Sequence, residues 1–178
     1  MHIMDRKPVT LETMKANAAT LFSGELLLAA GDYSAGEHNA MTVGWGFAGY
    51  AWGRPVVVVM VRPQRYTFNF MENYPDFTLS AFDGYYREAL KIMGTKSGRD
   101  CDKYALAGLT PIAAKTVAAP AFAEARLVIE CKKTLVRAVV EQDFIDAGVV
   151  NEAYAARDFH KLYFGEVTFV EEARTRIK

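Results

Sequence analysis

Hydrophobic residues fall into short runs along the chain, and most of these runs predict β-strands. The clearest is residues 56–61, a continuous and mainly β-branched run that predicts a central barrel strand buried on both faces. Residues 126–140 predict a longer strand with a bend, in which Leu127, Ile129 and Cys131 share one face. Further strands are expected at residues 25–30, 39–47, 77–82 and 161–170. Together they predict a mainly β protein with inserted helices, built as a small antiparallel barrel.

Helix signals stand between the predicted strands. Pro63 suits the first turn of a helix that reaches about residue 74. Shorter helices are expected at residues 87–93, stopped by Gly94, and at residues 102–107, stopped by Gly-Leu-Thr-Pro at 108–111. Near the start of the chain, Thr10 is expected to cap a helix with one apolar face, formed by Leu11, Met14, Ala18, Leu21 and Phe22.

Two glycine-containing segments separate these elements. Residues 31–37 predict a turn that sends the chain back antiparallel. Residues 48–55 are rich in glycine and aromatic residues and predict a loop that exposes the rings of Tyr50 and Trp52. Because large exposed apolar patches usually mark interfaces, this loop favours a homodimer.

Length and charge limit the classes of protein. The 178 residues suit a single domain, 1–178, with residues 1–24 as an N-terminal helical extension. The 21 basic and 21 acidic residues cancel, so the chain has no global field that would select nucleic acid or an acidic membrane surface. No apolar run approaches the ~20 residues that span a bilayer. No secretory signal is visible in the chain as given, so we expect a cytoplasmic protein with reduced cysteines.

The chain lacks the usual signals of catalysis by side chains. Its three histidines stand apart, which disfavours a metal site, and His160 is interpreted as a surface or interface residue rather than a base. Residues 44–49 match the letters Gly-x-Gly-x-x-Gly, but no helix follows, so these glycines are interpreted as bends or as places of close ligand approach. Because no acid, base or nucleophile stands out in the chain, any catalysis is expected to belong to a bound cofactor, and this points to a redox cofactor.

Three polar blocks predict one site for a flat, anionic ligand: residues 39–45, 62–67 and 94–103. Arg62 and Arg65 flank a proline at an expected helix start, where backbone N–H groups and guanidinium groups suit a phosphate. Exposed arginines at a helix start are more often simply solvated, and this alternative stays open.

These blocks carry a family resemblance. Asn-x-Met-Thr-Val-x-Trp at 39–45, Val-Arg-Pro-x-Arg-Tyr-Thr at 61–67 and Gly-x-x-Ser-Gly-Arg-Asp-x-Asp-Lys at 94–103 resemble the flavin reductase-like, FMN-binding split-barrel family. The similarity runs from about residue 26 to 170. It implies a six-stranded antiparallel Greek-key barrel, a homodimer, and FMN near the subunit interface. Many relatives have a cysteine where this chain has Met93, so a thiol role is excluded there.

The resemblance also implies which residues bind FMN. Those expected at the ring are Asn39, Met41, Thr42 and Val43, and those expected at the phosphate end are Arg62, Arg65, Thr67, Ser97 and Lys103. Gly44, Trp45, Tyr66 and Gly98 complete the predicted cofactor-binding set.

The leading hypothesis is an oxidoreductase that passes electrons from NADH or NADPH through FMN to flavin, iron or another small acceptor. The alternative is a flavoredoxin-like carrier that exchanges electrons with a protein partner. A third class, a dimeric binding module without flavin, is disfavoured because the anion-binding residues are present. The identity of the donor and of the acceptor is left open by the sequence.

Overall fold

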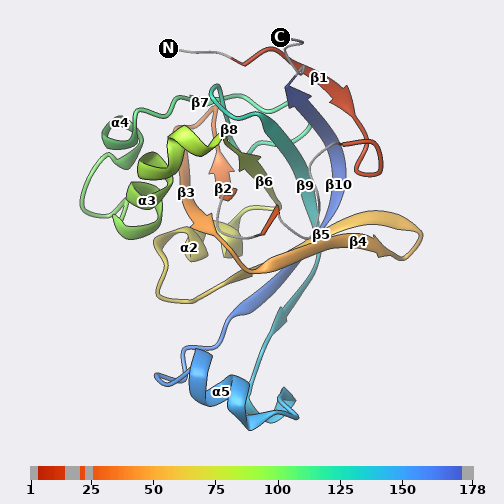
Figure 1. Ribbon diagram of the computed structural model, residues 1–178, viewed down its shortest axis with the longest axis vertical. Helices are drawn as coiled ribbons and strands as arrows, with labels where there is room; N and C mark the ends of the chain where they lie inside the picture. The colour runs from red at the N-terminus through yellow and green to blue at the C-terminus, as the bar shows by residue number, and fades with distance from the viewer. Residues whose placement is uncertain (1–3, 15–20, 23–25, 174–178) are drawn as a thin grey trace.

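The computed structural model of the protein describes residues 4–14, 21–22 and 26–173. Within these residues an eight-stranded antiparallel sheet has the order β3-β2-β6-β9-β10-β5-β4, and β1 pairs with β10. Figure 1 shows this sheet curling around the centre of the molecule. Its strands are β1 (Arg6–Val9), β2 (Leu26–Asp32), β3 (Glu37–Val43), β4 (Gly46–Ala51), β5 (Arg54–Val61), β6 (Asp76–Ala81), β9 (Leu127–Ala138) and β10 (Lys161–Ala173).

The helices lie mainly beside β3. A short separate pair of strands, β7 (Pro111–Ile112) and β8 (Ala121–Phe122), precedes β9 in the chain. The helices are α2 (Tyr66–Asn73), α3 (Arg87–Thr95), α4 (Lys103–Ala107) and α5 (Ala147–Ala153), with 3-10 turns η1 (Gly84–Tyr86) and η2 (Glu141–Asp143). Figure 1 shows α3 and α4 grouped on one side, next to β3.

Strand β2 shows why the chain forms two hydrophobic cores. Leu26 and Leu28 belong to the cluster inside the barrel, together with valines of β5. Leu27, between them, belongs to a second cluster that packs the sheet against α3. Alternation along a strand therefore places apolar side chains on both faces, and full burial of each leucine contributes about 1.5–3 kcal/mol.

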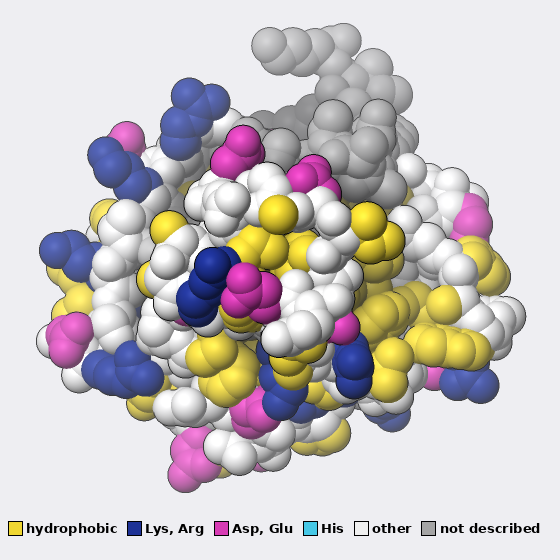
Figure 2. All heavy atoms as spheres, turned by 90° about the horizontal axis from the view of Figure 1, so that it is seen from below, with side chains coloured by type: hydrophobic (Ala, Val, Ile, Leu, Met, Phe, Trp, Pro, Cys, Tyr) yellow, Lys and Arg dark blue, Asp and Glu magenta, His cyan; other side chains and the backbone are white. Residues whose placement is uncertain are grey.

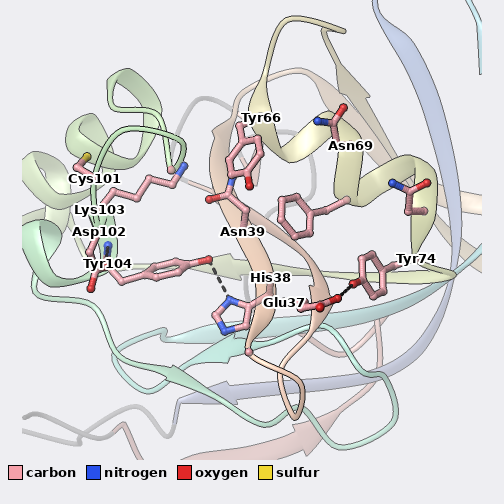
Figure 3. Close-up of a pocket in the computed structure, with 14 residues that line it drawn as sticks. Glu37, His38, Asn39, Tyr66, Asn69, Tyr74, Cys101, Asp102, Lys103 and Tyr104 are labelled. Atoms are coloured by element: carbon pink, nitrogen blue, oxygen red, sulfur yellow. Dashed lines mark hydrogen bonds between the residues drawn. The ribbon is translucent and has the colours of Figure 1, made fainter.

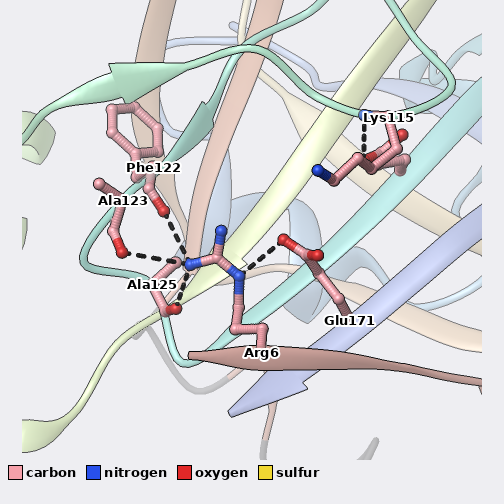
Figure 4. Close-up of polar contacts among 7 residues, drawn as sticks. Arg6, Lys115, Phe122, Ala123, Ala125 and Glu171 are labelled. Carbon is pink, nitrogen blue, oxygen red and sulfur yellow. Dashed lines mark hydrogen bonds and ion pairs between the residues drawn. The ribbon is translucent and has the colours of Figure 1, made fainter. Parts of the chain in front are cut away.

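The N-terminal strand β1 is held by one arginine (Figure 4). Arg6 Nε donates to Glu171 Oε1 at 2.7 Å, and Nη1 donates to the carbonyl oxygens of Phe122, Ala123 and Ala125. The side chain is only 6% exposed. Arg6 therefore joins β1 to β10 and to the segment at the end of β8.

Residues 139–160, which we call the arm, project away from the barrel at the ends of β9 and β10 (Figure 1). The arm carries α5 and a small aromatic cluster, with ring centroids of Tyr154 and Phe159 4.8 Å apart. Arg62, directly after β5, ties the arm to the barrel through Asp158 and the carbonyl oxygen of Ala153. The sequence patterns did not predict α5.

The predicted mainly β class with a split barrel is confirmed, but several details need correction. Six strands is an approximation, since seven lie on the sheet path and β1 adds an eighth. Residues 48–55 do not form a loop: they belong to the β4–β5 hairpin, whose turn uses positive φ at Trp52 (54°) and Gly53 (72°). The rings of Tyr50 and Trp52 are nonetheless exposed, by 65% and 62%.

Helix boundaries also differ from the expectation. Helix α2 begins at Tyr66, so Pro63 lies before it, and Gly94 lies inside α3, which continues to Thr95. The predicted helix after Thr10 falls largely on residues 15–20, outside the described part of the chain. The described residues after Thr10 form a turn rather than a helix, in which Met14 N donates to Thr10 O at 2.9 Å. No helix among the described residues is long and apolar enough to cross a membrane.

Candidate functional site

Three cavities formed by described residues border β3. A cavity of about 570 Å³ lies between β3, α2 and α4, and one of about 530 Å³ lies between β3 and α3. A smaller one, of about 230 Å³, lies where β3 ends and meets the end of β5. We call them the α2, α3 and strand-end cavities. Each is lined by at least one residue of the predicted cofactor-binding set.

The structure divides the predicted residues among these cavities. Asn39, Tyr66, Gly98 and Lys103 line the α2 cavity. Met41, Thr42, Val43, Gly44, Trp45, Arg62 and Arg65 line the strand-end cavity. Thr42 and Arg65 also line the α3 cavity, whereas Thr67 and Ser97 line none of the three.

The start of α2 is joined to β3 by buried polar groups. Asn39 Nδ2 donates to Thr67 Oγ1 at 2.8 Å, and both side chains are buried. Gly98 closes over them, because a Cβ at that position would lie 2.5 Å from Asn39 Oδ1. Arg65 occupies the N-cap of α2 without a side-chain capping bond, so the first N–H groups of the helix have no capping side chain. An uncapped helix start is a natural position for an anion.

Lys103 and Arg65 place two positive charges at this point. Lys103 is 3% exposed, and its Nζ donates to the carbonyl oxygen of Ala40. Figure 3 shows the Lys103 side chain reaching toward Asn39 from the side of α4. Burial and the nearby charge of Arg65 lower the pKa of Lys103 to about 8. Arg65 Nη2 donates to Gly94 O at 2.7 Å, and burial lowers its pKa as well. Neither side chain forms an ion pair within the described residues.

The strand-end cavity is bordered by a short stretch of β3 and the turn after it. Met41 and Val43 point into the barrel core, while Thr42 is half-buried and its Oγ1 donates to Leu90 O at 2.6 Å. Gly44 and Trp45 are exposed. Thr42 and Val43 therefore lie on opposite faces of β3, as alternation along a strand requires.

Arg62 and His160 form the other wall of this cavity. Arg62 Nη1 donates to Asp158 Oδ2 at 2.6 Å, so its charge is already balanced within the chain. His160 lies against Trp45, with 4.9 Å between ring centroids, and its Nδ1 is 2.8 Å from Tyr154 Oη. Burial, and then the charge of Arg62, lower the pKa of His160 to about 4, so the ring is neutral at neutral pH.

Sequence reasoning missed the position of His160, which is buried within the chain rather than lying on its surface. It also missed His38 and Tyr104, which line the α2 cavity and lie 3.2 Å apart between Nδ1 and Oη. Each is a single aromatic residue without a motif, and only the fold brings them to the site. Arg99, by contrast, belongs to the third polar block, and its guanidinium lies 4.7 Å from the centre of the Tyr66 ring.

Ser97 has a local role in the same loop. Its Oγ accepts a hydrogen bond from Arg99 N at 3.2 Å, and its carbonyl oxygen accepts from Asp100 N at 3.1 Å. These bonds shape the turn that places Gly98 against Asn39. Among the described residues, no group of three or more His, Cys, Asp or Glu side chains is arranged to hold a metal ion.

These residues fit FMN, which combines a flat ring with a phosphate. The cations of Arg65 and Lys103 and the uncapped start of α2 suit the phosphate. The exposed backbone at Gly44 and the Trp45 ring offer an approach for a flat group at the strand end. Arg62 is the residue whose predicted phosphate role is least supported, because Asp158 already neutralises it.

Known proteins match the chain in sequence family and in fold. Solved structures with the same fold include an FMN-binding domain of a flavin reductases-like enzyme from Shewanella baltica OS155, with a TM-score of 0.69 and 17% identity over 97% of this chain and 80% of that chain. Flavoredoxin of Desulfovibrio vulgaris (Miyazaki F) has a TM-score of 0.66 and 21% identity over 96% of this chain and 79% of that chain.

A third similar structure is the NADH:FAD oxidoreductase SgcE6 of Streptomyces globisporus C-1027 in complex with NAD and FAD fragments. Its TM-score is 0.61, with 16% identity over 84% of this chain and 74% of that chain. No curated protein matches the chain. The family model described as "Flavin reductase like domain" matches residues 19–177, and the chain therefore belongs to the flavin reductase-like family.

Proposed function

We propose that the protein is an FMN-dependent oxidoreductase of the flavin reductase type, which takes electrons from NADH or NADPH and passes them to flavin, iron or another small acceptor. The observation that carries this proposal is the pair of cations at the start of α2. Arg65 and Lys103 have no acidic partner within the described residues, although burying an unpaired charge is unfavourable. A bound phosphate would supply the missing negative charge.

Bound FMN would supply the redox chemistry, and the protein would bind and orient it. Arg65, Lys103 and the backbone N–H groups of Tyr66 and Thr67 would hold its phosphate end. Backbone groups near Thr42 and Val43 are suited to meet the polar edge of the ring, where fixed donors stabilise developing negative charge.

One wall of the strand-end cavity, formed by Arg62 and His160, carries no net charge, because Arg62 is paired with Asp158. His160 is neutral at neutral pH and packs on Trp45, so this wall is aromatic. Arg62 holds the arm against it through Asp158 and Ala153. Gly44 and Trp45, which also line the cavity, are exposed.

A homodimer is part of the proposal. The β4–β5 hairpin exposes three large rings, Phe47, Tyr50 and Trp52, each by more than half. Figure 2, which looks at the molecule from the α5 end, shows hydrophobic side chains gathered on the side where this hairpin lies. A second copy of the chain would cover them, as expected for an apolar patch of this kind.

A flavoredoxin-like electron carrier is the second candidate, supported by the similarity in fold to flavoredoxin. The two functions differ in whether a free nicotinamide nucleotide is oxidised. The deciding experiment records the absorption spectrum of the purified protein loaded with FMN, anaerobically, while NADH or NADPH is added. Bleaching of the flavin bands followed by reoxidation with added flavin or iron supports the reductase. A stable oxidised spectrum with both nucleotides supports the carrier, and no flavin binding at all refutes both.

A further inference from the structure

The α3 cavity is unusually cationic for a chain with no net charge. Its lining includes Arg65, Arg87 and Lys91, against Asp83 as its acidic residue. Arg87 and Lys91 lie four residues apart on α3 and so share one face of the helix. With a volume of about 530 Å³, the cavity is large enough for a phosphorylated sugar rather than an ion alone.

The charges in this cavity are poorly compensated. Asp83 already lies near another cation, with Oδ1 3.7 Å from Arg126 Nε. Lys91 faces Glu88 at 4.0 Å, but both side chains are more than 70% exposed, so this pair contributes little. Arg87 and Arg65 form no ion pair within the described residues. The cavity therefore has a local surplus of positive charge.

The position of the cavity suggests its ligand. Thr42 and Arg65 line both the α3 cavity and the strand-end cavity, so the two spaces meet at these side chains. A nicotinamide dinucleotide is a long molecule, in which two riboses and a pyrophosphate separate the nicotinamide from the adenine. If its nicotinamide reaches a flavin at the strand end, its adenosine half has to lie in a neighbouring space.

We propose that Arg87 and Lys91 bind the 2′-phosphate of NADPH, so that the protein prefers NADPH to NADH. This inference rests on the proposed function and names the donor for it. NADH has a hydroxyl at the 2′ position and would offer these two cations no phosphate. Arginine suits the role because its guanidinium donates two parallel hydrogen bonds to a phosphate.

The first test measures binding directly and does not require turnover. The probes are 2′,5′-ADP, which carries the 2′-phosphate, and 5′-AMP, which does not, each titrated calorimetrically into FMN-loaded protein. We expect 2′,5′-ADP to bind roughly ten- to a hundredfold more tightly, and Arg87→Ala to abolish most of that difference. Arg137→Ala is the matched control, because Arg137 is exposed on β9 and lines none of the three cavities.

The second test compares kcat/KM for NADPH and NADH. Arg87→Ala should lower the value for NADPH by roughly ten- to a hundredfold and that for NADH by less than about threefold. Equal binding of the two probes, or equal losses with both donors, overturns the proposal. So does a loss of FMN affinity in Arg87→Ala without any change toward 2′,5′-ADP, because the cation would then serve the flavin phosphate. Failure of the parent protein to bind FMN refutes the proposed function instead, and the probe titration on flavin-free protein still tests the cation site.

Discussion

Replacing Lys103 by methionine is expected to make the flavin-free protein more stable and its FMN binding weaker. The pKa of Lys103 falls from its usual 10.5 to about 8, first because the side chain is buried and then because Arg65 is close. At about 1.4 kcal/mol per pKa unit, the charged ammonium costs the folded protein about 3 kcal/mol at neutral pH. Losing the hydrogen bond to Ala40 O offsets about 1 kcal/mol of this. A net gain of about 1–2 kcal/mol is therefore expected.

The pH dependence has a definite sign. Because the folded protein has the lower pKa, it binds fewer protons than the unfolded chain between about pH 8 and 10.5. The contribution of Lys103 to stability therefore rises with pH through this window, and Lys103→Met lacks the rise. For FMN the sign is opposite: a phosphate favours the charged ammonium, so affinity is highest below about pH 8 and falls as the pH increases.

The assay combines urea unfolding of flavin-free protein at pH 7 with FMN titrations from pH 6.5 to 9.5, followed by quenching of flavin fluorescence. Lys133→Met is the matched control, since Lys133 Nζ also donates to a backbone carbonyl, that of Met71, but lines none of the three cavities. The control should leave FMN affinity unchanged. A Lys103→Met protein that is less stable than the parent and binds FMN within about twofold of it would refute the reasoning.

Three further outcomes are expected. Arg65→Ala should weaken FMN by roughly ten- to a hundredfold and leave riboflavin binding almost unchanged, as titrations with both ligands will show. Gly98→Ala should also weaken FMN, because its Cβ would displace the Asn39 side chain, and an unchanged affinity would contradict this placement. Light scattering should give the mass of a dimer, and a parent mass near 19.8 kDa would exclude it. The double variant Tyr50→Ser, Trp52→Ser should contain more monomer than the parent, because it removes two exposed rings.

The sheet was predictable where hydrophobicity alone decides the structure. The apolar side chains of the continuous run at 56–61 and of the alternating run at 127–131 lie in strands that pack in the hydrophobic core, as expected, because exposing them to water is unfavourable. The β4–β5 hairpin was not predicted, since Gly49, Gly53 and the aromatic residues between 48 and 55 suggested a loop. Pairing with β5 supplies the strand with hydrogen bonds that local sequence does not reveal.

The site was predictable as a set of residues but not as an arrangement. Blocks around Asn39, Arg65 and Gly98 meet because β3, the start of α2 and the loop before α4 lie together. His160 could not be assigned from sequence, because it packs against Trp45, which lies 115 residues earlier in the chain. Long-range contacts of this kind leave no periodic signal.

Arg62 and Arg65 show why the partner of a charge matters more than its position in sequence. Both flank the same proline, and from sequence they look equivalent. In the fold the Arg62 side chain meets Asp158 at 2.6 Å and stabilises the arm. Among the described residues, the hydrogen-bond partner of the Arg65 side chain is a backbone carbonyl, that of Gly94. A cation that already has an acidic partner gains little from a phosphate, because the partner has supplied the negative charge. Arg65 is therefore the residue through which phosphate binding should be tested, even though the chain as a whole is electrically neutral.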